Sequence, residues 1–138
     1  MSTGAIKTKG ELVTNLLFGF RGRLTRAKFW SVALGIFVVE LILFAALGGQ
    51  AAMSANPQES LPAIGPIAGI MIFIFAVVVT WIALAVAVKR YHDRDKSGWW
   101  VLIIFVPLVG GFWYLIECGF LRGTEGYNQY GADPLIRY

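Results

Sequence analysis

Charged side chains are scarce in this sequence. Asp, Glu, Lys and Arg make up 14% of its 138 residues, whereas hydrophobic residues make up 57%. A soluble domain of this size needs a polar surface on every side, and so few charges cannot supply one. The apolar residues also fall into long runs, so the composition predicts an integral membrane protein.

Cysteine and histidine are nearly absent, which limits the possible chemistry. The single cysteine, Cys118, excludes a disulfide within the chain. A metal site needs three or four ligands, and no second His or Cys lies near His92, so we expect no metal and no cofactor. We interpret His92, Asp93 and Asp95 as a local network of salt bridges and caps, although an acid beside a histidine could also tune a proton shuttle.

Catalytic arrangements are missing as well. The sequence shows no Ser/His/Asp arrangement, phosphate-binding loop or paired catalytic carboxylates, so we expect a protein that is not an enzyme. It also has no soluble basic domain, so we expect no nucleic-acid partner.

Three hydrophobic stretches are long enough to cross a bilayer, at about 29–49, 64–88 and 99–121. As helices, each would extend about 30 Å or more, which is the thickness of the hydrocarbon core. The pattern therefore predicts an all-α fold with three transmembrane helices. The 29–121 segment would form the membrane domain, preceded by a basic segment over 1–28 and followed by a polar tail over 122–138.

The third stretch is interrupted near its middle by Pro107, Gly110 and Gly111. We expect a proline kink in a helix that still crosses fully, which places the C-terminus outside. The alternative is a re-entrant hairpin that turns at residues 107–111 and keeps the C-terminus inside. Its arms would each be too short to span.

Lys and Arg are distributed unevenly between the loops. Residues 1–28 hold six and residues 89–98 hold four, whereas the 50–63 loop has none. By the positive-inside rule, the N-terminus and the 89–98 loop are expected in the cytoplasm and the 50–63 loop outside. Within the first segment, Leu12, Val13, Leu16, Leu17 and Phe20 recur at helical spacing. This predicts a short amphipathic helix at the membrane interface.

Three short segments are more specific than generic membrane flanks: FGFRGRLTRAKFW over 18–30, KRYHDRDKSGWW over 89–100 and GTEGYNQYGADP over 123–134. In this order, with hydrophobic spans between them, they resemble the bacterial inner-membrane family called domain of unknown function 805. The resemblance covers residues 18–134. It implies a multi-pass protein of the bacterial inner membrane but no activity, because the function of the family is itself undefined.

Basic residues on the expected cytoplasmic side suggest a lipid contact. We predict a patch that binds anionic headgroups, partly neutralised by Asp93 and Asp95. Its candidate residues are Arg21, Arg23, Arg26, Lys89, Arg90 and Arg94. The same residues could serve only to fix the topology, or could dock on a larger membrane complex.

Other residues have expected structural roles. Asn128 and Asp133 of the third segment are assigned to the same network as His92, and Glu117 is expected to reach the interface. We expect four aromatic residues to anchor the protein at the membrane interface: Phe29, Trp30, Trp99 and Trp100.

Glu40 is the acid deep within a predicted span. It lies 11 residues past Phe29, about 16 Å into the membrane, where a carboxylate needs protein or water around it. One reading is a protonated side chain bonded to Thr80 or Trp81. The other is an ion or proton site, or a subunit contact, in an oligomeric transporter or channel.

Overall fold

A computed structural model describes residues 8–53 and 66–136. Within these ranges the chain is helical and contains no strand, which confirms the predicted all-α class. The elements are α1 (Lys9–Phe18), α2 (Arg26–Met53), α3 (Pro66–Asp93), the 3₁₀ helix η1 (Gly98–Phe105), α4 (Val109–Tyr114) and the π-helix η2 (Leu115–Phe120).

Helices α2 and α3 are the two long apolar elements. Each has 28 residues, and α3 begins at Pro66, whose fixed backbone angle and missing N–H suit the first helical position. Among the described residues, two helical segments are long and apolar enough to cross a membrane, Arg26–Ala46 and Gly69–Asp93. In the most apolar stretches of these two segments, only 6% and 17% of the residues are buried. Most of their side chains therefore face outward, as contact with lipid requires.

The chain divides into two compact units. One contains residues 31–80, the greater parts of α2 and α3. The other contains residues 1–30 and 81–138, which include the last turns of α3. The three sequence motifs all lie in the second unit.

A helix is present in the N-terminal segment where the apolar spacing predicts one. It begins with a capping box, in which the Thr8 hydroxyl accepts a bond from the Glu11 N–H while the Glu11 carboxylate accepts one from the Thr8 N–H. Phe20 lies beyond the end of α1 and packs edge-on against Trp81 at 5.1 Å. The placement of α1 at a membrane interface stays a prediction.

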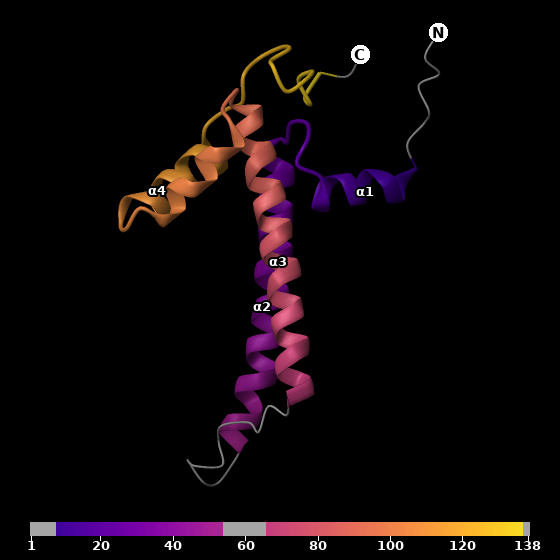
Figure 1. The fold of residues 1–138 in the computed structure, drawn as a ribbon, viewed down its shortest axis with the longest axis vertical. Helices are drawn as coiled ribbons and strands as arrows, with labels where there is room; N and C mark the ends of the chain where they lie inside the picture. The colour runs from indigo at the N-terminus through magenta and orange to yellow at the C-terminus, as the bar shows by residue number, and fades with distance from the viewer. Residues whose placement is uncertain (1–7, 54–65, 137–138) are drawn as a thin grey trace. The chain divides into compact units, whose positions relative to one another are not determined.

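The prediction of one kinked helix for the third hydrophobic stretch is wrong. The stretch folds as a hairpin whose first arm is η1 and whose second arm is α4 and η2 (Figure 1). Val106 has an extended ψ of 115°, the conformation that a following proline favours, so the helix ends before Pro107. Leu108 then takes a positive φ of 65° and the chain reverses.

Gly110 allows the two arms of the hairpin to approach closely. A Cβ at this position would lie 2.0 Å from the carbonyl oxygen of Ile103 on the first arm. Pro107 thus ends the first arm, and Gly110 lets the second pack against it.

Candidate functional site

Asp93, at the end of α3, is the centre of a buried charge cluster. Its Oδ1 accepts a bond from Nε of Arg23 at 3.0 Å, and its Oδ2 pairs with Nη1 of Arg90. The side chains of Arg23, Arg90 and Asp93 are exposed by only 2%, 0% and 6%. One carboxylate therefore lies between two arginines from different sequence motifs.

Main-chain carbonyls occupy the remaining donors of both arginines. Arg23 donates from Nη1 to the carbonyl of Gly126 at 2.6 Å and from Nη2 to that of Thr124. Arg90 donates from Nε to the carbonyl of Cys118 at 2.7 Å and from Nη2 to that of Leu121. The structure therefore does not place Arg23 and Arg90 in the exposed patch that the sequence suggested, because both guanidinium groups bind the folded chain instead.

The polar tail folds back on the end of α3. The N–H and the hydroxyl of Thr124 both donate to the carbonyl of Asp93, at 2.8 and 3.1 Å. Asn128 Nδ2 donates to the carbonyl of His92 at 2.9 Å, and the His92 ring stacks on Tyr130 with centroids 3.8 Å apart. We call the following set the Asp93 cluster: Arg23, Arg90, His92, Asp93, Thr124, Asn128 and Tyr130.

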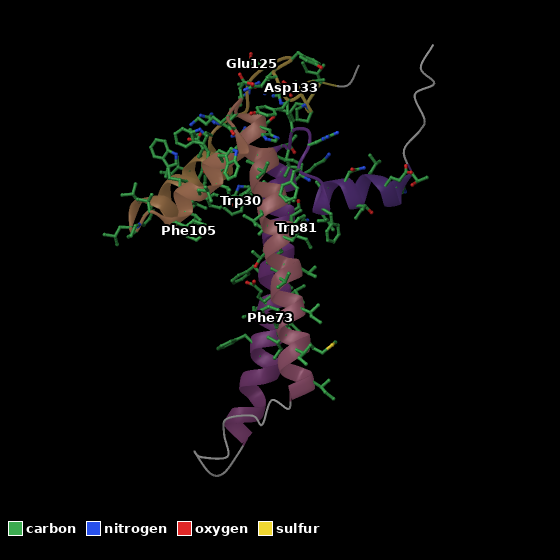
Figure 2. All side chains as sticks on the ribbon, in the orientation of Figure 1. Trp30, Phe73, Trp81, Phe105, Glu125 and Asp133 are labelled. Carbon is green, nitrogen blue, oxygen red and sulfur yellow. The ribbon has the colours of Figure 1, made fainter. Side chains whose placement is uncertain are left out.

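The last motif is also folded by local contacts. Asp133, which is buried, accepts bonds from the N–H groups of Gly126 at 3.3 Å and Leu135 at 2.9 Å. Figure 2 shows Asp133 and Glu125 on this tail. Asn128 and Asp133 thus lie in the same structure as His92, as the sequence suggested, while Asp95 contacts Gln129 of the tail through its carboxylate and its carbonyl.

A second charged group lies at the base of the hairpin. Glu117, expected to reach the interface, is 3% exposed and pairs with Arg94 at 3.0 Å and Lys96 at 2.7 Å. Burial raises the pKa of Glu117, but the bonds from Lys96 and Arg94 outweigh burial and hold it below its ordinary value. The Lys96 ammonium also lies over the rings of Trp100 and Trp113, 4.8 and 5.9 Å from their centroids.

The predicted aromatic anchors separate into two kinds. Phe29 is buried against Trp30 and Tyr114, so it belongs to the core and not to an exposed belt. Trp30 is partly exposed but donates from Nε1 to the carbonyl of Gly119 at 3.1 Å. Trp99 and Trp100 are 76% and 43% exposed, as interfacial side chains would be.

A groove of about 300 Å³ lies beside α1. Apolar side chains of α1 form part of it, and none of the described residues that line it is acidic. We call it the basic groove, lined by Leu12, Val13, Asn15, Leu16, Arg21, Arg23, Leu24, Lys28 and Lys89. Lys28 was missed by the sequence reasoning, because it falls outside the repeated arginine positions of the motif.

Lys89 joins α1 to α3 at the basic groove. It is 3% exposed, and its ammonium donates to the carbonyls of Asn15, at 2.8 Å, and Leu16. These carbonyls lie in the last turn of α1, at the negative end of the helix dipole, where a cation is favoured. Lys89 is thus a helix-capping residue, and Arg21 and Lys28 are the exposed cations of the groove.

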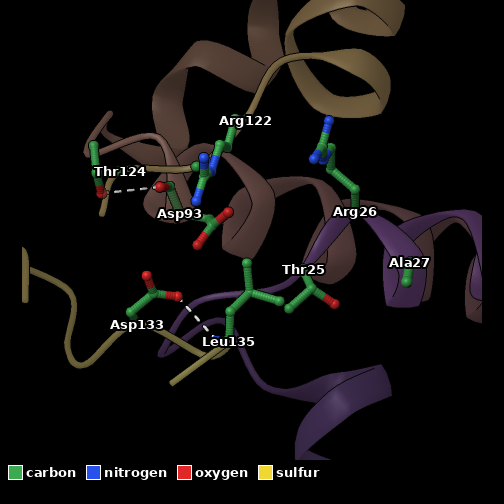
Figure 3. Close-up of a pocket in the computed structure, with 9 residues that line it drawn as sticks. Thr25, Arg26, Ala27, Asp93, Arg122, Thr124, Asp133 and Leu135 are labelled. Carbon is green, nitrogen blue, oxygen red and sulfur yellow. Dashed lines mark hydrogen bonds between the residues drawn. The ribbon is translucent and has the colours of Figure 1, made fainter. Parts of the chain in front are cut away.

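A separate pocket of about 300 Å³ lies between the tail and the start of α2 (Figure 3). Arg26 and Arg122 line it, but so do Asp93 and Asp133. Arg26 donates to the carbonyl of Phe120 at 3.0 Å, and Arg122 pairs with Glu125 at 3.1 Å. Its charges are thus mixed, whereas the described residues that line the basic groove include no acid.

Within the unit of residues 31–80, Glu40 lines an apolar groove of about 480 Å³ together with Thr80. Among the described residues, no side chain forms a hydrogen bond or ion pair with the Glu40 carboxylate. No group of three His, Cys, Asp or Glu side chains in this part of the chain, or elsewhere in the described ranges, is placed to hold a metal ion.

Residues 17–132 match the family described as "Protein of unknown function (DUF805)". The chain belongs to this family. It is 33% identical to the inner membrane protein YhaH of Escherichia coli K12 over 121 residues, which cover 86% of this chain and 88% of YhaH. It is 48% identical to the inner membrane protein YhaI of the same strain over 52 residues, 37% of this chain and 42% of YhaI.

Another relative, the uncharacterized protein YiiR of Escherichia coli K12, is 28% identical over 141 aligned residues, which cover 85% of this chain and 86% of YiiR. No protein of solved structure matches the chain. In this structure residues of all three motifs meet around the buried carboxylate of Asp93 and the end of α3. The family and these relatives support a bacterial inner-membrane protein.

Proposed function

We propose that this DUF805 protein is a non-enzymatic, multi-pass inner-membrane protein that binds the headgroup of an anionic phospholipid in the basic groove. The observation that carries the proposal is the lining of that groove, with four cationic side chains and, among the described lining residues, no acid. A phosphate diester would be attracted there, since each Lys or Arg near a membrane surface contributes about 1 kcal/mol to binding anionic lipid.

Arg21 and Lys28 are the residues we assign to the headgroup. Both are exposed, whereas Arg23 is bound to Asp93 and Lys89 caps α1. The planar fork of Arg21 can donate two parallel bonds to a phosphate, and Lys28 adds a point charge. The buried cations hold the groove in shape, and the exposed ones meet the ligand.

Helix α1 supplies the apolar side of the same site. Leu12 and Val13 line the groove and are 54% and 53% exposed. A helix lying in the membrane interface would place such side chains against the upper part of the acyl chains. This arrangement favours a lipid headgroup over a free phosphate, which would make no use of the apolar wall.

We place the N-terminal segment and residues 94–97 in the cytoplasm. The support is the distribution of Lys and Arg, with six in residues 1–28 and none in residues 50–63, of which 54–63 lie outside the described residues. The basic groove then faces the cytoplasmic leaflet.

Native mass spectrometry tests the lipid site. Wild type and an Arg21→Gln/Lys28→Gln variant are released from membranes containing phosphatidylglycerol and phosphatidylethanolamine. A Lys9→Gln/Arg122→Gln variant removes the same charge from exposed positions outside the groove. We expect roughly a 30-fold weaker affinity for phosphatidylglycerol in the groove variant only, which corresponds to two lost contacts of about 1 kcal/mol each. Equal retention by all three proteins contradicts the site.

A second candidate function is an oligomeric transporter or channel subunit. The specific observation is the Glu40 carboxylate, which lines an apolar groove and has no hydrogen-bond or ion-pair partner in the part of the chain that the structure describes; a charge there is costly without a partner. Two or three spans make a thin wall for a conduit, so this function requires self-association or docking on a larger membrane complex. A defined ring in native membranes favours it, whereas a monomer with bound phospholipid favours the lipid site.

A further inference from the structure

The two ends of the hairpin of residues 98–120, which we call its base, are fixed by contacts with residues near the Asp93 cluster. Where the first arm starts, Lys96 pairs with Glu117 of the second arm at 2.7 Å. Where the second arm ends, Arg90 binds the carbonyls of Cys118 and Leu121. The tail that follows is bonded to Arg23 and Asp93. The start of the first arm and the end of the second arm therefore lie close together, beside the end of α3.

Neither arm of the hairpin is long enough to cross a bilayer. The first arm, Gly98–Phe105, has 8 residues, about 16 Å at the 3₁₀ rise of about 2.0 Å per residue. The second arm, residues 109–120, extends about 18 Å at 1.5 Å per residue. A hydrocarbon core is about 30 Å thick, so the hairpin reaches about halfway.

The tip of the hairpin is apolar and exposed. Leu108, Phe105 and Phe112 are 91%, 79% and 73% exposed, and Figure 2 shows Phe105 on this hairpin. The sequence from 97 to 116 contains no charged residue, whereas Lys96 and Glu117 stand at its two ends. Trp100 and Trp113 lie near the Lys96 ammonium at the base. Along the hairpin, charged residues are followed by tryptophans and then by an uncharged apolar tip. A membrane has the matching order, from charged headgroups through the interface to hydrocarbon.

The backbone of the turn also suits an apolar environment. The N–H of Val106 donates to the carbonyl of Ile103, that of Gly110 to Val106, and that of Val109 to Pro107. Pro107 has no N–H to leave unpaired. Bonding of these three donors within the chain lowers the cost that keeps loops out of hydrocarbon.

We propose that residues 98–120 insert into the cytoplasmic leaflet as a half-depth wedge, with the acyl chains of that leaflet covering its tip. The chain then returns to the side it came from. Residues 122–136 lie on the same side of the membrane as the N-terminal segment, opposite to the side that a third full span requires. This proposal does not depend on the lipid-headgroup site.

Cysteine accessibility in intact cells tests the topology. In a Cys118→Ala background, single cysteines replace Gln58, Lys96 or Glu125, and an impermeant maleimide is added before or after permeabilisation. We expect Glu125→Cys and Lys96→Cys to behave alike, labelled only after permeabilisation, while Gln58→Cys is labelled at once. Labelling of Glu125→Cys, but not Lys96→Cys, in intact cells would falsify the wedge.

The depth of the tip is tested with a nitroxide spin label on Leu108→Cys in lipid nanodiscs. We expect the label to collide with oxygen and to be shielded from a water-soluble nickel chelate. A label on Glu125→Cys is the control and should show the reverse. Ready collision of the Leu108 label with the nickel chelate would place the tip in water and overturn the proposal.

Discussion

At the scale of single residues, Asp93 has the largest role in the structure. It neutralises two buried arginines, and its main-chain carbonyl binds Thr124 of the tail. Gly123 is part of the same packing, because a Cβ there would lie 2.0 Å from Oδ2 of Asp93. The acid and the glycine beside it are thus constrained by the same contact, although they are 30 positions apart.

Replacing Asp93 with Asn should destabilise the protein strongly. The change leaves Arg23 and Arg90 buried without a counter-charge, which typically costs about 3–5 kcal/mol. Asp95→Asn is the matched control, since Asp95 contacts Gln129 at an exposed site and Asn also tolerates its φ of 57°. We expect that control to change stability by less than about 0.5 kcal/mol.

Thermal unfolding in detergent measures both Asp93 and Asp95 variants. A fall in Tm for Asp93→Asn alone supports the role of the buried cluster. If the two variants unfold at the same temperature, the arginines do not depend on Asp93 in the folded protein.

At the scale of elements, the hairpin contains two adjacent glycines with opposite surroundings. A Cβ at Gly110 would lie 2.0 Å from the Ile103 carbonyl, whereas one at Gly111 would meet nothing within 4 Å. We expect Gly110→Ala to separate the arms and lower the Tm. Gly111→Ala should be neutral or stabilising by up to about 1 kcal/mol, because alanine favours helix. Similar Tm values for the two variants would mean that the arms do not pack as described.

Lys89 makes two of the hydrogen bonds that hold the end of α1, and Trp81 Nε1 makes a third, to the carbonyl of Phe18 at 3.4 Å. Lys89 binds the carbonyls of Asn15 and Leu16, so Lys89→Met should free the end of α1 while keeping a long apolar stem. Hydrogen–deuterium exchange should then rise in Lys9–Phe18 and stay unchanged in the middle of α3. Lys28→Met, in the same groove but outside this contact, should leave the exchange of α1 as in wild type. Unchanged exchange in the Lys89 variant would show that other contacts hold α1.

At the scale of the whole molecule, Glu40 offers a test of whether this protein acts alone. A charged residue at mid-membrane costs about 2.5–3.5 kcal/mol on insertion scales, and its groove offers Thr80 as a polar neighbour. A structural role predicts that Glu40→Gln is tolerated and that Glu40→Leu changes stability or oligomeric state. An ion or proton role predicts that both variants abolish function.

The mass of the protein in native nanodiscs, together with Tm, separates these outcomes for Glu40. If Glu40→Leu raises the Tm and leaves the mass and any phenotype unchanged, the carboxylate has neither role.

Much of this protein is determined by its sequence alone. Low charge and long apolar runs predict helices in a membrane, so the all-α class and the two candidate spans, Arg26–Ala46 and Gly69–Asp93, could be expected from the sequence. The three motifs identified the family before any geometry was known. The assignment of His92, Asn128 and Asp133 to one structure also followed from the motifs.

Tertiary structure decided which charges are available and where the third stretch goes. The sequence offers both Arg21 and Arg23 as candidate lipid contacts, but of the two only Arg23 lies beside Asp93, a pairing 70 positions apart that no local pattern encodes. Pro107 is compatible with a kink or a reversal. The choice depends on whether Gly110 can pack on Ile103 and whether Arg90 can bind Cys118 and Leu121, which are contacts between elements. Local preferences set the helices, and long-range contacts set the direction of the chain between them.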